Sequence, residues 1–209
     1  MILVCLIIFA VTIIYFFLVE RVKKFIGLLV IQGILLFVIA FINLHQMNLL
    51  ALIIILLETL LVKAVVIPWF MNKLRNTNNL KRVHESKVTV FYSVLITTGI
   101  IIMSFILGYF IKNPYIQLKF FTVAVSTVIG GMYFIIIHKN IFSHIVGFLI
   151  IENGAFLLSL AVGHEFPFLV SMAVLIDLLM AILVIGVFVN KIGNTFEDMS
   201  ISNITHLKD

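Results

Sequence analysis

Charged residues are scarce in this chain, cysteine is almost absent, and the common motifs of soluble enzymes are missing. Charged residues make up 11% of the 209 residues and hydrophobic ones 63%, whereas a soluble domain carries about 25% charged residues. The single cysteine, Cys5, excludes disulfides within the chain, iron–sulfur clusters held by its own cysteines and cysteine-type zinc sites. The sequence has no HExxH, GxSxG, P-loop or Gly-rich dinucleotide motif. Soluble-type catalysis and cofactor binding by this chain are therefore not expected.

Long apolar runs make up most of the sequence. Runs of about 20 residues recur, and a helix of that length crosses a hydrocarbon layer about 30 Å thick. The first run starts at Met1 with no basic segment before it and no small-residue cleavage site after it, so we interpret it as a retained span. The sequence predicts an all-α, polytopic integral membrane protein with about seven transmembrane helices. The expected spans are residues 1–19, 25–43, 48–70, 88–111, 117–137, 141–162 and 167–190.

Lysine and arginine gather on one side of these spans. That side carries 11 of the 14 basic residues, the other side carries two, and Lys63 lies within a span. Because cytoplasmic loops are enriched in Lys and Arg, we expect the N-terminus outside and the C-terminus in the cytoplasm. The basic loop "MNKLRNTNNLKRVHESK" (71–87) divides the chain. We expect an N-terminal three-span region with this loop (1–87), a fourth span with its connector (88–116), and a three-span region with a short cytoplasmic tail (117–209).

Four ionisable residues nevertheless fall well inside the spans: Glu58, Lys63, Glu152 and Asp177. Counting from the span ends places the three carboxylates near the bilayer midplane, with Lys63 about 7.5 Å closer to the cytoplasm than Glu58. A charge at the centre of a transmembrane helix costs about 2.5–3.5 kcal/mol on insertion scales. Such groups should face the bundle interior, pair, meet water or be neutral. Because burial and pairing can move their proton affinities, we interpret the four as candidate proton-relay residues.

Structural roles remain open for these residues. Lys63 has the alternative of extending its ammonium to the cytoplasmic interface. Glu58 and Lys63 are five residues apart and would point about 140° apart on a regular α-helix, so we expect each to find a partner on another span. Glu152 and Asn153 have the alternative role of packing glue, with a protonated carboxyl hydrogen-bonded across helices. Asn153 and His144 are the residues that we expect to support a relay.

Three stretches resemble one family of membrane proteins. They are "GFLIIENGAFLL" (147–158), "AVLIDLLMAILV" (173–184) with its acidic residue, and the span ending "VKAVVIPWFMNKL" (62–74). Each is similar to membrane component E of the hydrogenase-4 and formate hydrogenlyase type. With the sequence between them, the likeness covers nearly the whole chain.

The last three spans also resemble the small K-type membrane subunit of respiratory complex I. His138-Lys139-Asn140 matches the basic turn of that subunit, and Glu152 and Asp177 stand for its two midplane acids. Glu152 lies one helical turn later than the first of those acids, and Asp177 is one methylene shorter than a glutamate. Both differences keep an acid near the midplane.

These resemblances imply a non-catalytic membrane-arm subunit of a membrane-bound nickel–iron (NiFe) hydrogenase, multi-pass in the inner (cytoplasmic) membrane. Its buried groups would contribute to proton or Na⁺ translocation coupled to redox chemistry in partner subunits. Those partners would carry the NiFe centre and the iron–sulfur clusters on the cytoplasmic side, and antiporter-like and complex I-like subunits would lie beside this chain in the lipid. No nucleic-acid partner is expected, because the basic residues sit next to spans. The alternatives are a small subunit of a multisubunit cation/proton antiporter and a purely structural membrane anchor for a hydrogenase.

Overall fold

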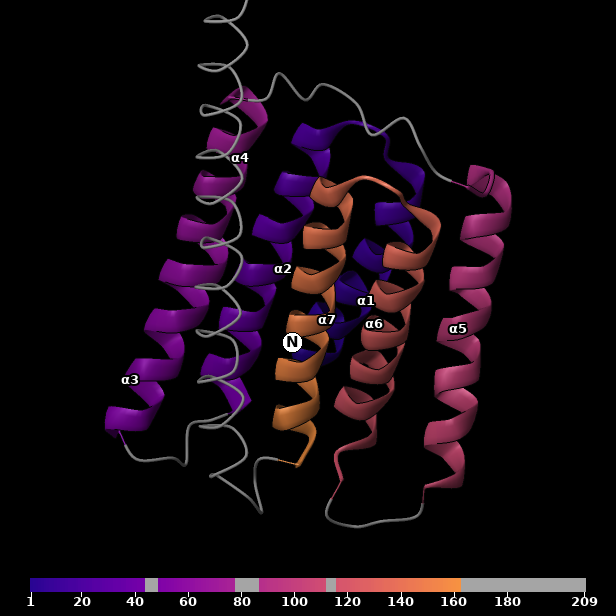
Figure 1. Cartoon of the computed structure of the whole chain (residues 1–209). Coiled ribbons are helices and arrows are strands. Elements are labelled where there is room, and N and C mark those ends of the chain that lie inside the picture. Colours follow the sequence, from indigo (N-terminus) through magenta and orange to yellow (C-terminus); the bar gives the residue numbers. More distant parts are fainter. Residues whose placement is uncertain (44–48, 78–86, 112–115, 163–209) are drawn as a thin grey trace, which may run out of the picture. The chain divides into compact units, whose positions relative to one another are not determined.

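The described part of the chain is built from helices alone. A computed structural model describes residues 1–43, 49–77, 87–111 and 116–162, all of which belong to one compact unit, Met1–Val174. No β-strand occurs in these four ranges. Figure 1 labels the helices α1 to α7, and η1 lies between α3 and α4. In chain order, the helices are α1 (Ile2–Leu18), α2 (Val22–Asn43), α3 (Leu49–Leu57), η1 (Glu58–Val66), α4 (Ile67–Thr77), α5 (Val90–Phe110), α6 (Leu118–Ile137) and α7 (Ile141–Val162).

The helices confirm the all-α class that the sequence predicts and are compatible with a membrane protein. Five segments of the described chain are long and apolar enough to cross a bilayer, and α1 is a shorter apolar helix. The five are Val22–Asn43, Ile55–Lys73, Val90–Phe110, Leu118–Ile137 and Phe142–Val162. Six of the expected spans thus coincide with helices, with α3, η1 and α4 together taking the third. The seventh expected span, residues 167–190, lies outside the described residues, so the count of seven stays a prediction.

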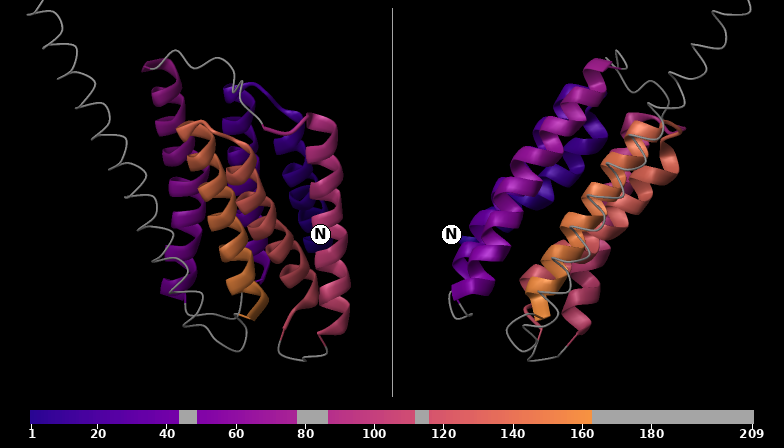
Figure 2. Two further views of the ribbon diagram at one scale, coloured as in Figure 1. Left: turned by 45° about the vertical axis from the view of Figure 1, so that its right-hand side comes forward. Right: turned by 60° about the vertical axis from the view of Figure 1, so that its left-hand side comes forward.

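Small residues bring α6 and α7 into close contact along their length. The two helices lie side by side in both views of Figure 2. A Cβ atom added to Gly131 would stand 3.0 Å from the backbone N of Ile151, and one added to Gly154 would stand 2.9 Å from the backbone N of Val128. Close approach of backbones through small residues is the usual means of helix association in lipid, where apolar burial between helices contributes little. These contacts hold α7, which carries Glu152, firmly against α6.

The third span contains a π-helical segment in its middle. Residues Glu58–Val66 form the π-helix η1, and at its end the Ile67 N–H donates to the Val62 carbonyl, five residues earlier. Pro68 follows, and it has no N–H to donate, so the change back to α-helical bonding falls beside it. The premise of a regular α-helix between Glu58 and Lys63 was therefore wrong, because five residues make one hydrogen-bonded turn of a π-helix.

Candidate functional site

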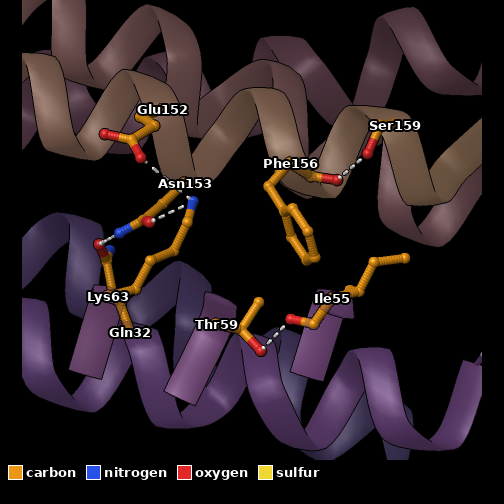
Figure 3. A network of polar contacts seen from close by, with 8 residues as sticks. All are labelled: Gln32, Ile55, Thr59, Lys63, Glu152, Asn153, Phe156 and Ser159. Atoms are coloured by element: carbon orange, nitrogen blue, oxygen red, sulfur yellow. Dashed lines mark hydrogen bonds and ion pairs between the residues drawn. The ribbon is translucent and has the colours of Figure 1, made fainter. Parts of the chain in front are cut away.

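Lys63 and Glu152 form a buried ion pair between η1 and α7. The Lys63 Nζ atom lies 3.6 Å from Glu152 Oε1, and the two side chains are 3% and 6% exposed. Figure 3 shows the lysine reaching from its own helix across to the helix that carries the acid. The alternative of an ammonium extended to the interface is therefore wrong. The expectation that Lys63 finds a partner on another span is confirmed.

Two more neighbours of the ammonium come from the same part of α7. Lys63 Nζ donates a hydrogen bond to Asn153 Oδ1 at 3.3 Å. The ammonium also lies 5.1 Å from the centre of the Phe156 ring, a distance at which the ring face attracts a cation. One stretch of α7 thus presents a carboxylate, an amide oxygen and an aromatic face to the same lysine. Of the two residues that we expected to support a relay, Asn153 is in the site.

The polar contacts continue from Asn153 through α2 to α1. Asn153 Nδ2 donates to Gln32 Oε1 at 3.0 Å, and Gln32 Nε2 donates to Thr12 Oγ1 at 2.9 Å. Thr12 Oγ1 in turn donates to the carbonyl of Phe9 at 2.6 Å. All of the side chains in this chain of bonds are buried. We call the five side chains Thr12, Gln32, Lys63, Glu152 and Asn153 the polar network.

The sequence analysis missed Thr12 and Gln32. Gln32 is an uncharged amide in an apolar run, and threonine is common in transmembrane helices, so neither carries the insertion cost that singles out a charge. A signal was nevertheless present, because Gln32-Gly33 and Asn153-Gly154 are both an amide followed by glycine. An amide beside a small residue in a span favours a site where two helices approach closely and exchange a hydrogen bond.

Gly33 sets the spacing between α2 and η1 beside the network. A Cβ atom added to Gly33 would stand 3.0 Å from the backbone N of Ala64 and 3.1 Å from the backbone carbonyl carbon of Lys63. Such distances are tighter than nine in ten real Cβ contacts, and the neighbouring atoms are helix backbone, so the position favours glycine. The contact fixes η1 against α2 at the residue that carries the ammonium.

The ion pair is buried, so the cost of removing its charges from water must be offset by its surroundings. Two unit charges 3.6 Å apart attract by roughly 5 kcal/mol at an effective dielectric constant of about 20. Removing the two ions from water costs several kcal/mol each, so the attraction alone does not favour the pair. The hydrogen bond to Asn153 and the aromatic face of Phe156 supply further stabilisation of the ammonium. The pair is therefore held by its surroundings as well as by the attraction between its two charges.

His144 lies apart from the contacts described for the polar network. Its Nε2 lies 2.9 Å from the carbonyl of His138, and His138 Nδ1 lies 2.9 Å from the carbonyl of Phe134. Because a carbonyl only accepts, each of these ring nitrogens carries the proton and donates it. His138 follows α6 directly, and burial lowers its pKa below 6.5, against the opposing effect of the Phe134 bond and with a further lowering from His144.

Two of the four candidate relay residues cannot be placed at side-chain level. The backbone of Glu58 begins η1, but its side chain lies outside the described part of the structure. Asp177 lies outside the described residues altogether. Among the described residues, no group of three or more His, Cys, Asp or Glu side chains is arranged to hold a metal ion.

Taken together, the helices and the buried pair define a helical membrane protein with ionisable groups in its interior. Comparison with known proteins connects part of it to hydrogenases. The chain is 26% identical over 166 residues to the uncharacterised protein Rv0085 of Mycobacterium tuberculosis, covering 76% of this chain and 74% of the relative. It is 29% identical over 86 residues to hydrogenase-4 component E of Escherichia coli K12, and the same match is found in Shigella flexneri.

The hydrogenase match is partial. It covers 41% of this chain and 40% of the length of the E. coli protein. No family model matches the chain, and no solved structure matches it. The chain therefore has a weak, partial similarity to a hydrogenase-4 subunit, together with a longer similarity to a protein without an assigned function.

Proposed function

We propose that this chain is a non-catalytic membrane-arm subunit of a hydrogenase-type complex, in which the Lys63–Glu152 pair takes part in proton or Na⁺ translocation. The observation that carries the proposal is the pair itself, a lysine and a glutamate buried 3.6 Å apart between two apolar helices. Buried ionisable residues in transmembrane segments are rare, and they mark ion and proton pathways. The partial similarity to hydrogenase-4 component E supports the type of complex.

The chemistry of the pair suits a proton relay. A proton that leaves Lys63 Nζ and binds a Glu152 carboxylate oxygen converts an ammonium–carboxylate pair into a neutral amine and carboxylic acid, with no net change of charge. The 3.6 Å separation is slightly longer than a hydrogen bond, so the transfer requires a small closing movement. Another charge that arrives nearby would change the relative free energies of the ion pair and of the neutral amine and carboxylic acid, because Coulomb interactions are strong in a medium of low dielectric constant. Glu58 and Asp177 are proposed as the next groups of the relay.

The topology and the partners are part of the same proposal. The chain would have seven spans in the inner membrane, with its N-terminus outside and its basic loop (71–87) in the cytoplasm. A hydrogenase module with NiFe and iron–sulfur centres would dock on the cytoplasmic side, and antiporter-like and complex I-like subunits would lie beside it. Lys63 and Glu152 would then form one section of a polar path along the membrane.

Purification of the complex from native membranes through a tag on this chain tests the proposal. We expect nickel- and iron-containing subunits to co-purify, and Glu152→Gln to lower the number of ions translocated per redox turnover while the complex still assembles. Ion translocation without any redox partner would indicate the antiporter alternative. A Glu152→Gln complex with reduced yield but unchanged ions per turnover would indicate a structural anchor and contradict the proposed role.

A further inference from the structure

The hydrogen bonds of the polar network all run in one direction. Starting at the ammonium, Lys63 donates to Asn153, Asn153 to Gln32, Gln32 to Thr12, and Thr12 to the backbone carbonyl of Phe9. The bonds cross four helices: η1, α7, α2 and α1. Figure 3 shows the part of this chain from Lys63 to Gln32.

The direction is set at both ends by groups with one hydrogen-bonding role. The Phe9 carbonyl only accepts, so the Thr12 hydroxyl must give it its proton and accept from Gln32 with its oxygen. The Gln32 amide is then oriented with its nitrogen toward Thr12 and its oxygen toward Asn153. The Asn153 amide is oriented in turn, with its oxygen toward Lys63. An ammonium, which only donates, fits that oxygen.

This series of hydrogen bonds, from Lys63 to the Phe9 carbonyl, is unsuited to conduct protons. Carboxamides have no proton that titrates near neutral pH, and the last acceptor is a backbone carbonyl. Thr12 and Gln32 make no described contact with the lysine, although they determine which atom of Asn153 faces it. We infer that Thr12 and Gln32 are positioning residues, which hold the Asn153 oxygen toward Lys63 and thereby keep the lysine aligned with Glu152 for ion translocation. The inference rests on the proposed function.

A set of matched variants separates positioning from packing. Thr12→Val removes the hydroxyl and keeps the branched shape, whereas Thr12→Ser keeps the hydroxyl. Thr97→Val is the control, because Thr97 is another fully buried threonine, on α5, and its hydroxyl donates to Ser93 outside the network. Gln32→Met removes the amide at similar length. Each variant is purified as the tagged complex, reconstituted into vesicles of phosphatidylethanolamine and phosphatidylglycerol, and measured for the protons or Na⁺ ions translocated per redox turnover.

We expect Thr12→Val and Gln32→Met to lower the ions translocated per turnover by about twofold or more, since a hydrogen bond between neutral groups shifts an equilibrium by roughly two- to tenfold. Thr12→Ser and Thr97→Val should retain the native ratio. An unchanged ratio in Thr12→Val and Gln32→Met, beside a lowered ratio in Glu152→Gln, would overturn the inference and leave the proposed function standing. An unchanged ratio in Glu152→Gln as well would overturn both. Failure of both Thr12→Val and Gln32→Met to assemble would assign the chain of bonds to holding the bundle together and would also overturn the inference.

Discussion

A lysine, and not an arginine, occupies the interior of this bundle. An arginine keeps its proton under all ordinary conditions, whereas a buried lysine can release it. Lys63 also has a compact ammonium that one carboxylate, one amide oxygen and one aromatic ring can surround, as Glu152, Asn153 and Phe156 do. The identity of the residue therefore agrees with a site where a proton is exchanged.

Neutralising one member of the ion pair should destabilise the protein more than neutralising both. Lys63→Met leaves a buried carboxylate without its ammonium, and Glu152→Gln leaves a buried ammonium without its carboxylate. Loss of one partner of a buried pair typically costs roughly 3–5 kcal/mol, while apolar or neutral replacement of both is often tolerated. We expect Lys63→Met with Glu152→Gln to unfold in detergent at a higher temperature than either single variant.

The control for this cycle is another lysine of the same helical span. Lys73, on α4, is exposed, and its ammonium lies 5.7 Å from the centre of the exposed Trp69 ring. Lys73→Met should change the unfolding temperature little. Single and double variants with additive effects would contradict an energetic coupling between Lys63 and Glu152.

His138 should make stability depend on pH. Its pKa in the folded protein is below the ordinary value of 6.5, mainly because it is buried. The unfolded chain therefore binds more protons in the window just below pH 6.5, so stability is full above that pH and is lost as the pH falls through it. We expect the unfolding temperature in detergent to drop between pH 7 and pH 5, and His138→Gln to flatten that part of the curve. A His138→Gln curve parallel to that of the native protein would exclude this histidine as the cause.

Charged residues of the site could be predicted from the sequence, and its uncharged residues could not. Lys63 and Glu152 stand out because a charge within a span is costly, and that cost requires a partner. The acid that faces Lys63 could not be predicted from positions along the spans, because these placed Glu58 and Glu152 at the same depth in the bilayer. The prediction also assumed a regular α-helix between Glu58 and Lys63. Gln32 and Thr12 escaped notice because an uncharged polar group can satisfy itself on its own helix, as the Thr97 hydroxyl does.

At the scale of elements, the helices were predictable and the π-helix was not. Six apolar runs became helices because their backbone groups have no water to bond with in lipid. Hydropathy is the same for α- and π-helical bonding, so it carries no signal for the change of register at Glu58. Pro68 was the only signal of it in the sequence, since a proline has no N–H and interrupts the regular backbone hydrogen bonds of a helix.

Gly33→Ala should disturb the contact between α2 and η1. The added methyl carbon would stand 3.0–3.1 Å from backbone atoms of Lys63 and Ala64, closer than ordinary van der Waals contact. Overpacking of this kind costs roughly 1–3 kcal/mol. Gly27→Ala is a matched control on the same helix, because nothing lies within 4 Å of its added Cβ. We expect Gly33→Ala to lower the unfolding temperature and Gly27→Ala to leave it unchanged or raise it. Equal effects of the two substitutions would show that the close contact at Gly33 is not needed.

At the scale of the whole molecule, the orientation in the membrane can be measured with single cysteines. Cys5 is the one cysteine of the chain, so Cys5→Ser gives a background without thiols. In that background, the basic side of the chain is expected in the cytoplasm. A membrane-impermeant maleimide added to intact cells should label Asn113→Cys, and it should label Asn78→Cys only after permeabilisation. The reverse pattern would invert the proposed topology.

The glycine contacts between α6 and α7 bear on which partner of the ion pair is more firmly held. Gly131 and Gly154 bring the backbones of the two helices close together, so we expect α7 to move little relative to α6. Lys63, by contrast, lies on a π-helical segment, a form of bonding that is rare and occurs mostly as single turns inside α-helices. We therefore expect a movement that opens or closes the 3.6 Å distance between Lys63 Nζ and Glu152 Oε1 to involve η1 more than α7.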